Sequence, residues 1–576
     1  MSVKKINLPS VEERRSSLEN HYQNWSRETL ASHFKKVCEN YKTRDFIVTE
    51  NDFSTYGEIW ENAEKYAKAL MGMGVQPRDH IAVLMENHPD YVSLLIASSL
   101  VGAVFIPVNT MLKKQELTYV LTQSDSKFLF FNEKIKKNNY AEMIVALWQE
   151  KKFQQQSKLI KAVRLGEQQD LKHDKIIEGS EFLKKSDTIA DQDFRERQEA
   201  AFYPDEISII MYTSGSTGQS KGVMLSHDML LRGAYATCLS RAIEEGRVTF
   251  AALPFYHCFN MIEGILAMSF VGGKLIAPNL FTPLSALKMM EKFKANDFLC
   301  VPSMLVPLLN QKDIESFDLT HLYAIWCGAA PAPITVWEKA TRLLGLKEIC
   351  TGYGQTEVSS SGVITEMGDP LSVIIRKVGR PKLGGIAGLK EFNGSIVQYK
   401  TIDTDTGETL AAGSIGELVV RGNTVTKGYY KKPEETAETI DKDGWLKTGD
   451  VGRIDENGYL EILGRSKELY KVSGELVAPK EIEAVINQIP AVNQACVVGV
   501  SDAITTEAGA VFVELKPGKT CEKDEIIKIC QRELARFKVP RYVWFIQPEE
   551  WPMTSTGKIQ KVKLREMAEN RLKSKE

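Results

Sequence analysis

A repeated alternation of strand-like and helix-like segments constrains the fold more than any other feature of this sequence. Short β-rich apolar runs at residues 46–48 and 80–85 flank a segment whose apolar residues recur at helical spacing. That helical segment begins after Thr55, a residue type that caps helices, and ends at the glycines of residues 72–74. Such alternation predicts an α/β fold of mostly parallel sheets covered by helices.

The pattern changes twice in the second half of the chain. Between residues 416 and 464, short strands and turns predict a β-rich subdomain, and after residue 466 a compact α+β pattern begins. We therefore predict a large N-terminal domain over residues 1–466 and a small α+β C-terminal domain over residues 467–576. The elements predicted for the small domain are a helix opened by Pro479, strands at 495–500 and 510–515, a helix near 525–534 and a strand at 542–546.

Two long segments carry no chemistry of their own. Residues 134–199 are polar with brief apolar runs, and we interpret them as a weakly constrained edge of the large domain. Residues 91–112 are uncharged and almost long enough to span a bilayer, but Gly102, Pro107 and several serines interrupt them. A buried helix followed by a buried strand is the better interpretation, so no transmembrane segment is predicted.

Composition excludes several classes of protein. A chain of 576 residues exceeds one ordinary domain, and its formal net charge of −2 gives no general case for nucleic-acid binding. The nine cysteines are scattered singly, without zinc spacing, and the polar N-terminus lacks the apolar core of a signal peptide. We expect a cytoplasmic protein, with peripheral membrane association left open and the oligomeric state undetermined.

A glycine- and hydroxyl-rich loop lies between two predicted strands at residues 207–211 and 223–225. Glycines allow a close approach to an anion, hydroxyls donate hydrogen bonds, and Lys221 adds positive charge, so the loop suits a polyphosphate such as ATP. It is not a P-loop, because Ser220 precedes the lysine and Gly222 follows it. Alone, such a loop is more often a flexible turn. Its remaining candidate ligand-binding residues are Thr213, Ser214, Gly215, Ser216, Thr217 and Gly218.

Two further motifs follow apolar runs, where open α/β sheets usually bind ligands. The first is Gly328, Ala329 and Ala330. The second comprises Gly352, Tyr353, Gly354, Gln355, Thr356 and Glu357.

Four motifs in order make the chain closely resemble the AMP-forming adenylate superfamily of acyl-CoA synthetases, adenylation domains and luciferases. The resemblance spans about residues 30–570, and a Gly-Tyr-Tyr-Lys-Lys-Pro run at 428–433 strengthens it. The motifs are YTSGSTGQSKGV at 212–223, GYGQTE at 352–357, GWLKTGD at 444–450 with Gly464 and Arg465, and PMTSTGK at 552–558.

The resemblance implies a two-step ligation that uses ATP, Mg²⁺ and coenzyme A. Carboxylate and ATP form an acyl-AMP and pyrophosphate, and a thiol then attacks the mixed anhydride. Lys558 would bridge the carboxylate and the α-phosphate as negative charge builds between them. The family pattern places His257 beside the carboxylate and makes Glu357 and Thr213 the residues that serve the magnesium ion.

The same resemblance implies the nucleotide contacts. The 213–221 loop would hold the β- and γ-phosphates, Gly328, Ala329 and Ala330 would line the adenine, and Tyr353 would stack on it. Asp450 would bind the ribose hydroxyls with help from Arg465. A hinge at Lys467 would present first Lys558 and then the Ser473, Gly474 and Glu475 region to the CoA channel.

Each of these residues also has a plainer interpretation. Asp450 follows a glycine and suits a turn, Glu357 suits a solvated carboxylate, and Arg465 suits a surface ion pair. An isolated histidine such as His257 is often structural. Glu263, in an apolar segment, either borders an acyl tunnel or faces solvent or pairs with a basic side chain.

We expect an acyl-CoA synthetase for a medium- or long-chain fatty acid or a similarly apolar carboxylic acid. After Pro254 the chain lacks the aspartate that would hold an α-amino group, and it ends soon after Lys558 without a carrier domain. Ligases that load a separate acyl carrier protein, aryl-CoA ligases and a non-enzymatic homologue that kept only the fold are the alternatives.

Overall fold

A computed structural model describes residues 8–166, 172–213, 219–330, 332–472, 475–502, 504–553 and 559–573. The chain forms two compact units. The first comprises residues 1–399 and 420–446, and the second comprises residues 400–419 and 447–576. The predicted boundary at residues 466 and 467 lies within the second unit and stays a prediction.

The first unit contains two seven-stranded sheets. In one, the strand order is β11-β10-β4-β3-β5-β8-β9, with parallel pairing except for the antiparallel β10/β11 hairpin. Its strands are β3 (His80–Leu84), β4 (Val104–Pro107), β5 (Ser126–Asn132), β8 (Lys161–Leu165), β9 (Ile176–Glu178), β10 (Ile207–Thr213) and β11 (Lys221–Ser226).

The second sheet has the order β16-β15-β14-β12-β13-β1-β2, and only its edge pair β1/β2 is antiparallel. The mostly parallel α/β architecture is therefore confirmed. The strands are β1 (Asp45–Val48), β2 (Phe53–Thr55), β12 (Val248–Phe250), β13 (Lys274–Ile276), β14 (Asp297–Cys300), β15 (Ala324–Cys327) and β16 (Glu348–Cys350).

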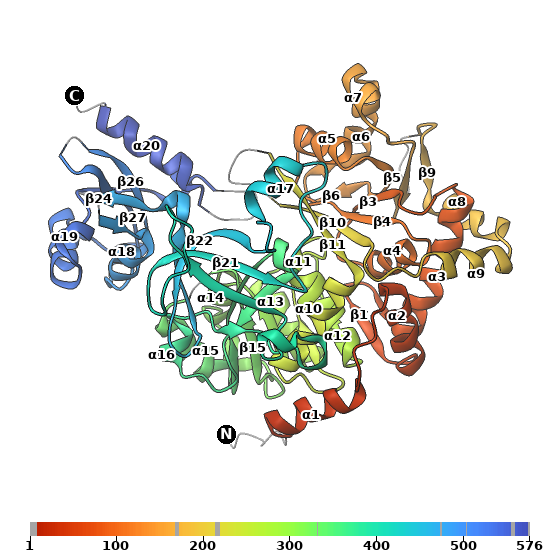
Figure 1. Cartoon of the computed structure of the whole chain (residues 1–576), viewed down its shortest axis with the longest axis horizontal. Helices are drawn as coiled ribbons and strands as arrows, with labels where there is room; N and C mark the ends of the chain where they lie inside the picture. The colour runs from red at the N-terminus through yellow and green to blue at the C-terminus, as the bar shows by residue number, and fades with distance from the viewer. Residues whose placement is uncertain are drawn as a thin grey trace. The chain divides into compact units, whose positions relative to one another are not determined.

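Helices cover both faces of the β3–β5 sheet (Figure 1). Ala82 and Leu84 of β3 join a core formed with α5 and α6, whereas Ile81 and Val83 join the larger core with α3 and α4. The helices of the first unit are α1 (Val11–His21), α2 (Leu30–Asn40), α3 (Tyr56–Gly72), α4 (Pro89–Leu100), α5 (Lys114–Gln123), α6 (Tyr140–Gln149), α7 (Lys151–Gln156), α8 (Gly179–Lys184), α9 (Asp191–Ala200), α10 (His227–Ser240), α11 (Cys258–Asn260), α12 (Ala267–Phe270), α13 (Pro283–Lys292), α14 (Pro302–Leu309), α15 (Ile334–Leu344), α16 (Leu371–Ile374) and α17 (Pro433–Thr439).

The described residues within 134–199 are packed more closely than their polar sequence predicts. Their brief apolar runs form β8 and β9 at the sheet edge, as well as α6, α7, α8 and α9. Tyr140, Ile144 and Leu147 of α6 are fully buried. The location at an edge is correct, but the description as weakly constrained is wrong for the packed part of this segment.

The uncharged segment at residues 91–112 is a buried helix followed by a buried strand, as predicted. It consists of most of α4 and of β4. Within the described ranges, none of the helices is both long enough and apolar enough to cross a membrane.

The N-terminal helix α1 attaches to the first unit through buried arginine contacts. Arg14 donates to Ala242 O at 2.8 Å and pairs with Glu348, and Arg15 donates to Leu239 O and Ser240 O. These carbonyls lie at the C-terminal end of α10, where positive charge is favourable.

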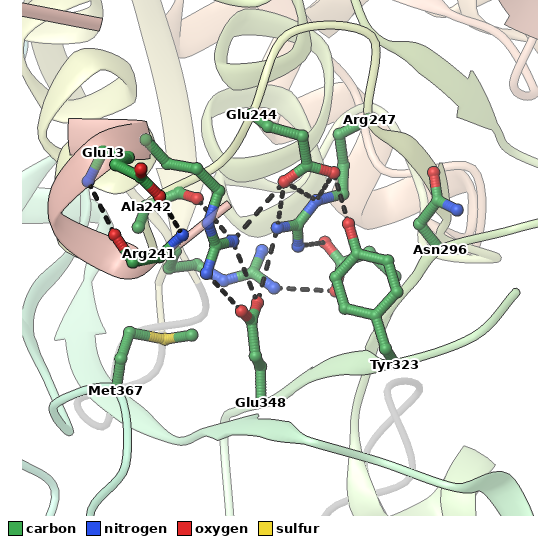
Figure 2. Close-up of polar contacts among 12 residues, drawn as sticks. Glu13, Arg241, Ala242, Glu244, Arg247, Asn296, Tyr323, Glu348 and Met367 are labelled. Atoms are coloured by element: carbon green, nitrogen blue, oxygen red, sulfur yellow. Dashed lines mark hydrogen bonds and ion pairs between the residues drawn. The ribbon is translucent and has the colours of Figure 1, made fainter. Parts of the chain in front are cut away.

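Arg14 is part of a buried cluster of three arginines and three carboxylates. Figure 2 shows Glu244, Arg247, Tyr323 and Glu348 pointing toward one another. In this cluster, Arg247 pairs with Glu244 at 2.6 Å and with Glu348 at 3.4 Å. Arg241 pairs with Asp297 at 2.7 Å, and Arg14 pairs with Glu348 and Glu244.

Smaller antiparallel sheets follow. The three-stranded sheet β17-β18-β19 consists of β17 (Gly352–Gln355), β18 (Ser360–Ile364) and β19 (Arg380–Pro381). The four-stranded sheet consists of β20 (Val397–Ile402), β21 (Gly416–Gly422), β22 (Leu446–Ile454) and β23 (Leu460–Arg465). The last three strands lie in the predicted β-rich region, and β20 precedes the predicted start at residue 416.

The C-terminal part of the second unit has the predicted α+β pattern. Its sheet has the order β25-β24-β27-β26, and β28 pairs in parallel with β27. The elements are β24 (Tyr470–Val472), β25 (Glu475–Val477), α18 (Pro479–Ile486), β26 (Val492–Asp502), β27 (Thr506–Leu515), α19 (Lys523–Glu533), β28 (Tyr542–Phe545) and α20 (Lys561–Lys573).

Candidate active site

The predicted phosphate loop joins the two strands of the β10/β11 hairpin. Thr213 ends β10 and is the register partner of Lys221, which begins β11. The Lys221 ammonium lies 4.7 Å from the centre of the Tyr429 ring. Ser214, Gly215, Ser216, Thr217 and Gly218 lie outside the described residues, so their predicted phosphate contacts stay predictions.

Tyr429 connects the hairpin with Glu357. Its hydroxyl donates to the Glu357 carboxylate at 3.0 Å, and Thr426 N donates to Glu357 O at 2.7 Å. Burial and the neighbouring Glu357 carboxylate raise the pKa of Tyr429, so this phenol stays protonated and remains a donor. Lys221 and Glu357 are thus brought to the same tyrosine. Tyr429 belongs to the run at residues 428–433 that strengthens the family resemblance, but the resemblance assigns it no role.

The turn after Glu357 has an unusual backbone. Ser359 and Ser360 have φ values of 55° and 80°, in the left-handed region that non-glycine residues rarely adopt. The Ser359 hydroxyl donates to Thr424 O at 2.8 Å. A Cβ on Gly354 would lie 1.9 Å from Ser360 O, so glycine is required where β17 approaches this turn.

The His257 segment lies beside two of the predicted nucleotide motifs. His257 is exposed and caps α11 by accepting from Phe259 N at 3.3 Å. A Cβ on Gly328 would lie 2.9 Å from the Phe259 ring, and the Thr356 hydroxyl lies 3.5 Å from Cys258 Sγ. The structure therefore brings these predicted residues together.

The remaining predicted residues of the first unit lie in the loop after β15 and in β17. Gly328 is buried, and Ala329 and Ala330 are exposed, with Ala329 at φ 67°. Tyr353 packs its ring 6.2 Å from Tyr399, and Gly352 pairs with Ile364 in β18. The Gln355 side-chain amide nitrogen is buried without a hydrogen-bond partner among the described residues, so an oxygen-rich ligand would satisfy it.

Asp450 and Arg465 face each other in the second unit. They are register partners in β22 and β23, and Arg465 Nε lies 2.9 Å from Asp450 Oδ1. Asp450 is buried, while the Arg465 side chain is 55% exposed. Arg465 therefore forms an ion pair, as its plainer interpretation expected. The predicted contact of Asp450 with the ribose stays a prediction. Ser473, Gly474 and Lys558 lie outside the described residues, and only the backbone of Glu475, in β25, is described.

Glu263 takes the plainer of its two interpretations. It is fully buried and pairs with Lys382, with Nζ at 2.9 Å and 3.0 Å from the two carboxylate oxygens. No sequence motif indicates this partner, which lies 119 positions further along the chain.

Comparison with known proteins agrees with this geometry. The family described as AMP-binding enzyme matches residues 34–430, and the family described as AMP-binding enzyme C-terminal domain matches residues 481–558. The putative acyl-CoA synthetase YngI of Bacillus subtilis is 33% identical, over 93% of this chain and 96% of its own length. The mitochondrial medium-chain acyl-CoA ligase ACSF2 of Danio rerio is 32% identical, over 94% and 89%.

Solved structures show the same architecture. ATP-bound MatB from Rhodopseudomonas palustris is 26% identical and superposes with a TM-score of 0.76, covering 93% of this chain and 98% of that chain. The anthranilate CoA ligase AuaEII in complex with anthranoyl-AMP shares the fold at 22% identity, with a TM-score of 0.78 and coverage of 94% and 98%.

The fold and site define an adenylate-forming enzyme. The chain belongs to the AMP-binding enzyme family and, within it, to the AMP-forming acyl-CoA synthetases.

Removing the Tyr429 hydroxyl tests its link to Glu357. We expect Tyr429→Phe to raise the magnesium–ATP concentration needed for half-maximal activity about ten-fold, because a hydrogen bond to a charged group contributes about 1.5 kcal/mol. Titration of ATP–pyrophosphate exchange measures this change. Tyr430→Phe is the matched control, since its hydroxyl donates to Asp125 instead. If both variants needed the same magnesium–ATP concentration for half-maximal activity, the Tyr429 hydroxyl would not contribute to magnesium–ATP binding.

Proposed function

We propose that this enzyme activates a medium-chain fatty acid, or a similarly apolar carboxylic acid, and transfers the acyl group to coenzyme A. The observation that carries the proposal is the convergence of Lys221 and Glu357 on Tyr429. Thr356, next to Glu357, contacts Cys258 in the segment that contains His257 and Phe259. The names of the medium-chain acyl-CoA ligases among its full-length relatives support the acid class.

The chemistry follows from charge placement. A carboxylate oxygen of the acid attacks the α-phosphorus of ATP, and pyrophosphate leaves. Two anions meet in this step, so cationic side chains lower its barrier. Lys221 would hold the β- and γ-phosphates, and Lys558 would stabilise the charge that develops between the reacting groups. The CoA thiol then attacks the acyl carbon, and AMP leaves.

A magnesium ion fits the residues present. Mg²⁺ is usually held by one or two carboxylates together with substrate phosphates. Glu357 and the Thr213 hydroxyl, which the family resemblance assigns to the ion, would hold it together with the phosphates, where it would neutralise their charge.

The residues near His257 favour an apolar acid without an amino group. The ring of Phe259 packs edge-on against Trp326 at 4.9 Å. Glu263 is neutralised by Lys382 and so does not offer a free carboxylate to a substrate ammonium. Hydrophobic and aromatic walls with few polar groups are typical of pockets for apolar ligands.

An acid panel tests this proposal. We would measure AMP release with CoA for saturated acids of two to sixteen carbons and for benzoate, and repeat the best acid with acyl carrier protein. The highest kcat/KM for a medium-chain acid with CoA would support the proposal. A preference for benzoate, acetate or carrier protein would contradict it. We place the reaction in the cytoplasm, which suits nine free, buried cysteines.

Lys467 tests the proposed hinge. It lies in the short turn η7 (Ser466–Glu468). A hinge needs a large change of backbone dihedral angles, which proline restricts. We expect Lys467→Pro to reduce one half-reaction strongly and spare the other, as measured by pyrophosphate exchange and by thioester formation from supplied acyl-AMP. Lys467→Ala is the control and should retain both. Equal losses in the proline variant would count against the hinge.

A further inference from the structure

Glu263 and Lys382 form a fully buried ion pair in the first unit. Glu263 lies in the π-helical turn η2 (Met261–Leu266), between α11 and α12, and Lys382 follows β19. Both side chains have no solvent exposure. A π-helical turn is rare and is frequently found at functional sites, and a buried charge is costly unless it is paired and hydrogen-bonded.

The Glu263 carboxylate uses its full acceptor capacity. It accepts from Ser361 N at 3.1 Å, from the Ser361 hydroxyl at 2.6 Å, from the Thr237 hydroxyl and from Lys382. A carboxylate offers about four acceptor positions. Two of these bonds go to one residue, Ser361, and hold both its backbone and its side chain.

Ser361 lies in β18, the strand that pairs with β17, and β17 contains the first four residues of the GYGQTE motif. Ser361 is the register partner of Gly354 in the β17/β18 pair. Ser359 and Ser360, with their left-handed backbones, lie between Glu357 and Ser361. Such backbone conformations persist when surrounding contacts hold them, and Glu263 supplies two of those contacts directly after the turn.

Lys382 also contacts the strand that leads into the motif at residues 328–330. Its ammonium lies 5.3 Å from the centre of the Trp326 ring, in β15 two residues before Gly328. A Cβ on Gly352 would lie 3.4 Å from Trp326 Nε1. The ion pair therefore contacts β15, which leads into Gly328, and β18, which pairs with the motif containing Glu357.

Stability alone is a weak reason for such a pair. Replacing a buried ion pair by apolar residues of similar size is often neutral or stabilising, whereas removing one partner is strongly destabilising. The geometry points to another purpose, which rests on the proposed function. We propose that Glu263 and Lys382 are positioning residues for adenylate formation, because they fix Ser361 and hence the turn that presents Glu357.

Two uncharged double variants separate positioning from charge balance. Glu263→Gln with Lys382→Met keeps a side-chain oxygen that accepts from Ser361 and an amide that donates to Thr237. Glu263→Leu with Lys382→Met has neither group. Both leave no unpaired charge. The Gln/Met variant should melt close to the wild-type temperature, and the Leu/Met variant should melt lower because the buried Ser361 donors lose their acceptor.

We expect the Gln/Met variant to retain ATP–pyrophosphate exchange within a few-fold of wild type. The Leu/Met variant should lose about 100-fold, the loss expected for a displacement of about 1 Å at a catalytic group. It should also bind a non-hydrolysable ATP analogue more weakly in calorimetry, and its order of preference among acids should not change. Thioester formation from supplied acyl-AMP should stay near normal.

Each other outcome overturns the inference. Equal rates of ATP–pyrophosphate exchange in the two double variants would show that the hydrogen bonds to Ser361 do not position Glu357. A changed acid preference with normal ATP binding would make Glu263 part of the acid pocket instead. If the Leu/Met variant does not fold, Ser361→Ala in the otherwise intact protein decides, since unchanged exchange would refute positioning and a loss would support it. Absence of exchange in the wild type with every acid would instead refute the proposed function.

Discussion

Replacement of Lys558 by alanine should lower adenylate formation about 100- to 1,000-fold, the usual loss on removing one donor that stabilises transition-state charge. The proposed role requires the lysine only while carboxylate and α-phosphate react, so the second half-reaction should be spared. Supplied with acyl-AMP and CoA, the variant should make thioester at nearly the wild-type rate. Separate assays of the two half-reactions measure this difference.

Lys563→Ala provides the control for Lys558. Lys563 is exposed on α20, five positions further along the chain, and its loss should leave both half-reactions unchanged. Normal adenylate formation by Lys558→Ala would show that the proposed role is wrong. An equal loss with supplied acyl-AMP would contradict it in the same way.

Arg247→Met should destabilise the first unit by about 3–5 kcal/mol, the usual effect of removing one partner of a buried ion pair. Arg247 has no exposed side-chain surface and lies between Glu244, Glu348 and Asp297, as Figure 2 shows for the first two. Without Arg247, the three carboxylates of the buried cluster would be paired with only two arginines, so the cluster would carry an uncompensated negative charge. We expect a large drop in the urea midpoint of the transition that reports on this unit.

Arg78→Met is the matched control for Arg247. Arg78 pairs with Glu206 on the surface, where its side chain is 75% exposed and solvent screens the interaction. Its replacement should leave the urea midpoint almost unchanged. Similar midpoints for Arg247→Met and Arg78→Met would contradict the stabilising role of the buried cluster.

Local patterns in the sequence predict much of the fold. The β10/β11 hairpin follows from two apolar runs around a glycine-rich loop, and α3 follows from Thr55, helical spacing and the glycines that end it. Residues 134–199 were harder to interpret because short apolar runs in a polar segment give little periodic signal. Their burial depends on α6 packing against strands elsewhere in the sheet.

The site was predictable where a motif carries its residues and not where distant segments meet. Resemblance indicated Glu357 and Lys221, but the position of Tyr429 between them is set by chain folding over more than 70 residues. Lys382 gives no motif, so its pairing with Glu263 was not visible in the sequence. The left-handed Ser359 and Ser360 were equally hidden, because serine carries no signal for positive φ.

The arginines of α1 also bear on where this protein can be shortened. The family match starts at residue 34, so a truncation at that limit would remove α1 entirely. Glu348 would lose its Arg14 partner, and Phe270 O and Asp228 would lose their bonds from Tyr22 and Trp25. We therefore expect a fragment that starts at residue 34 to be less stable than one that also includes α1 and the residues that follow it.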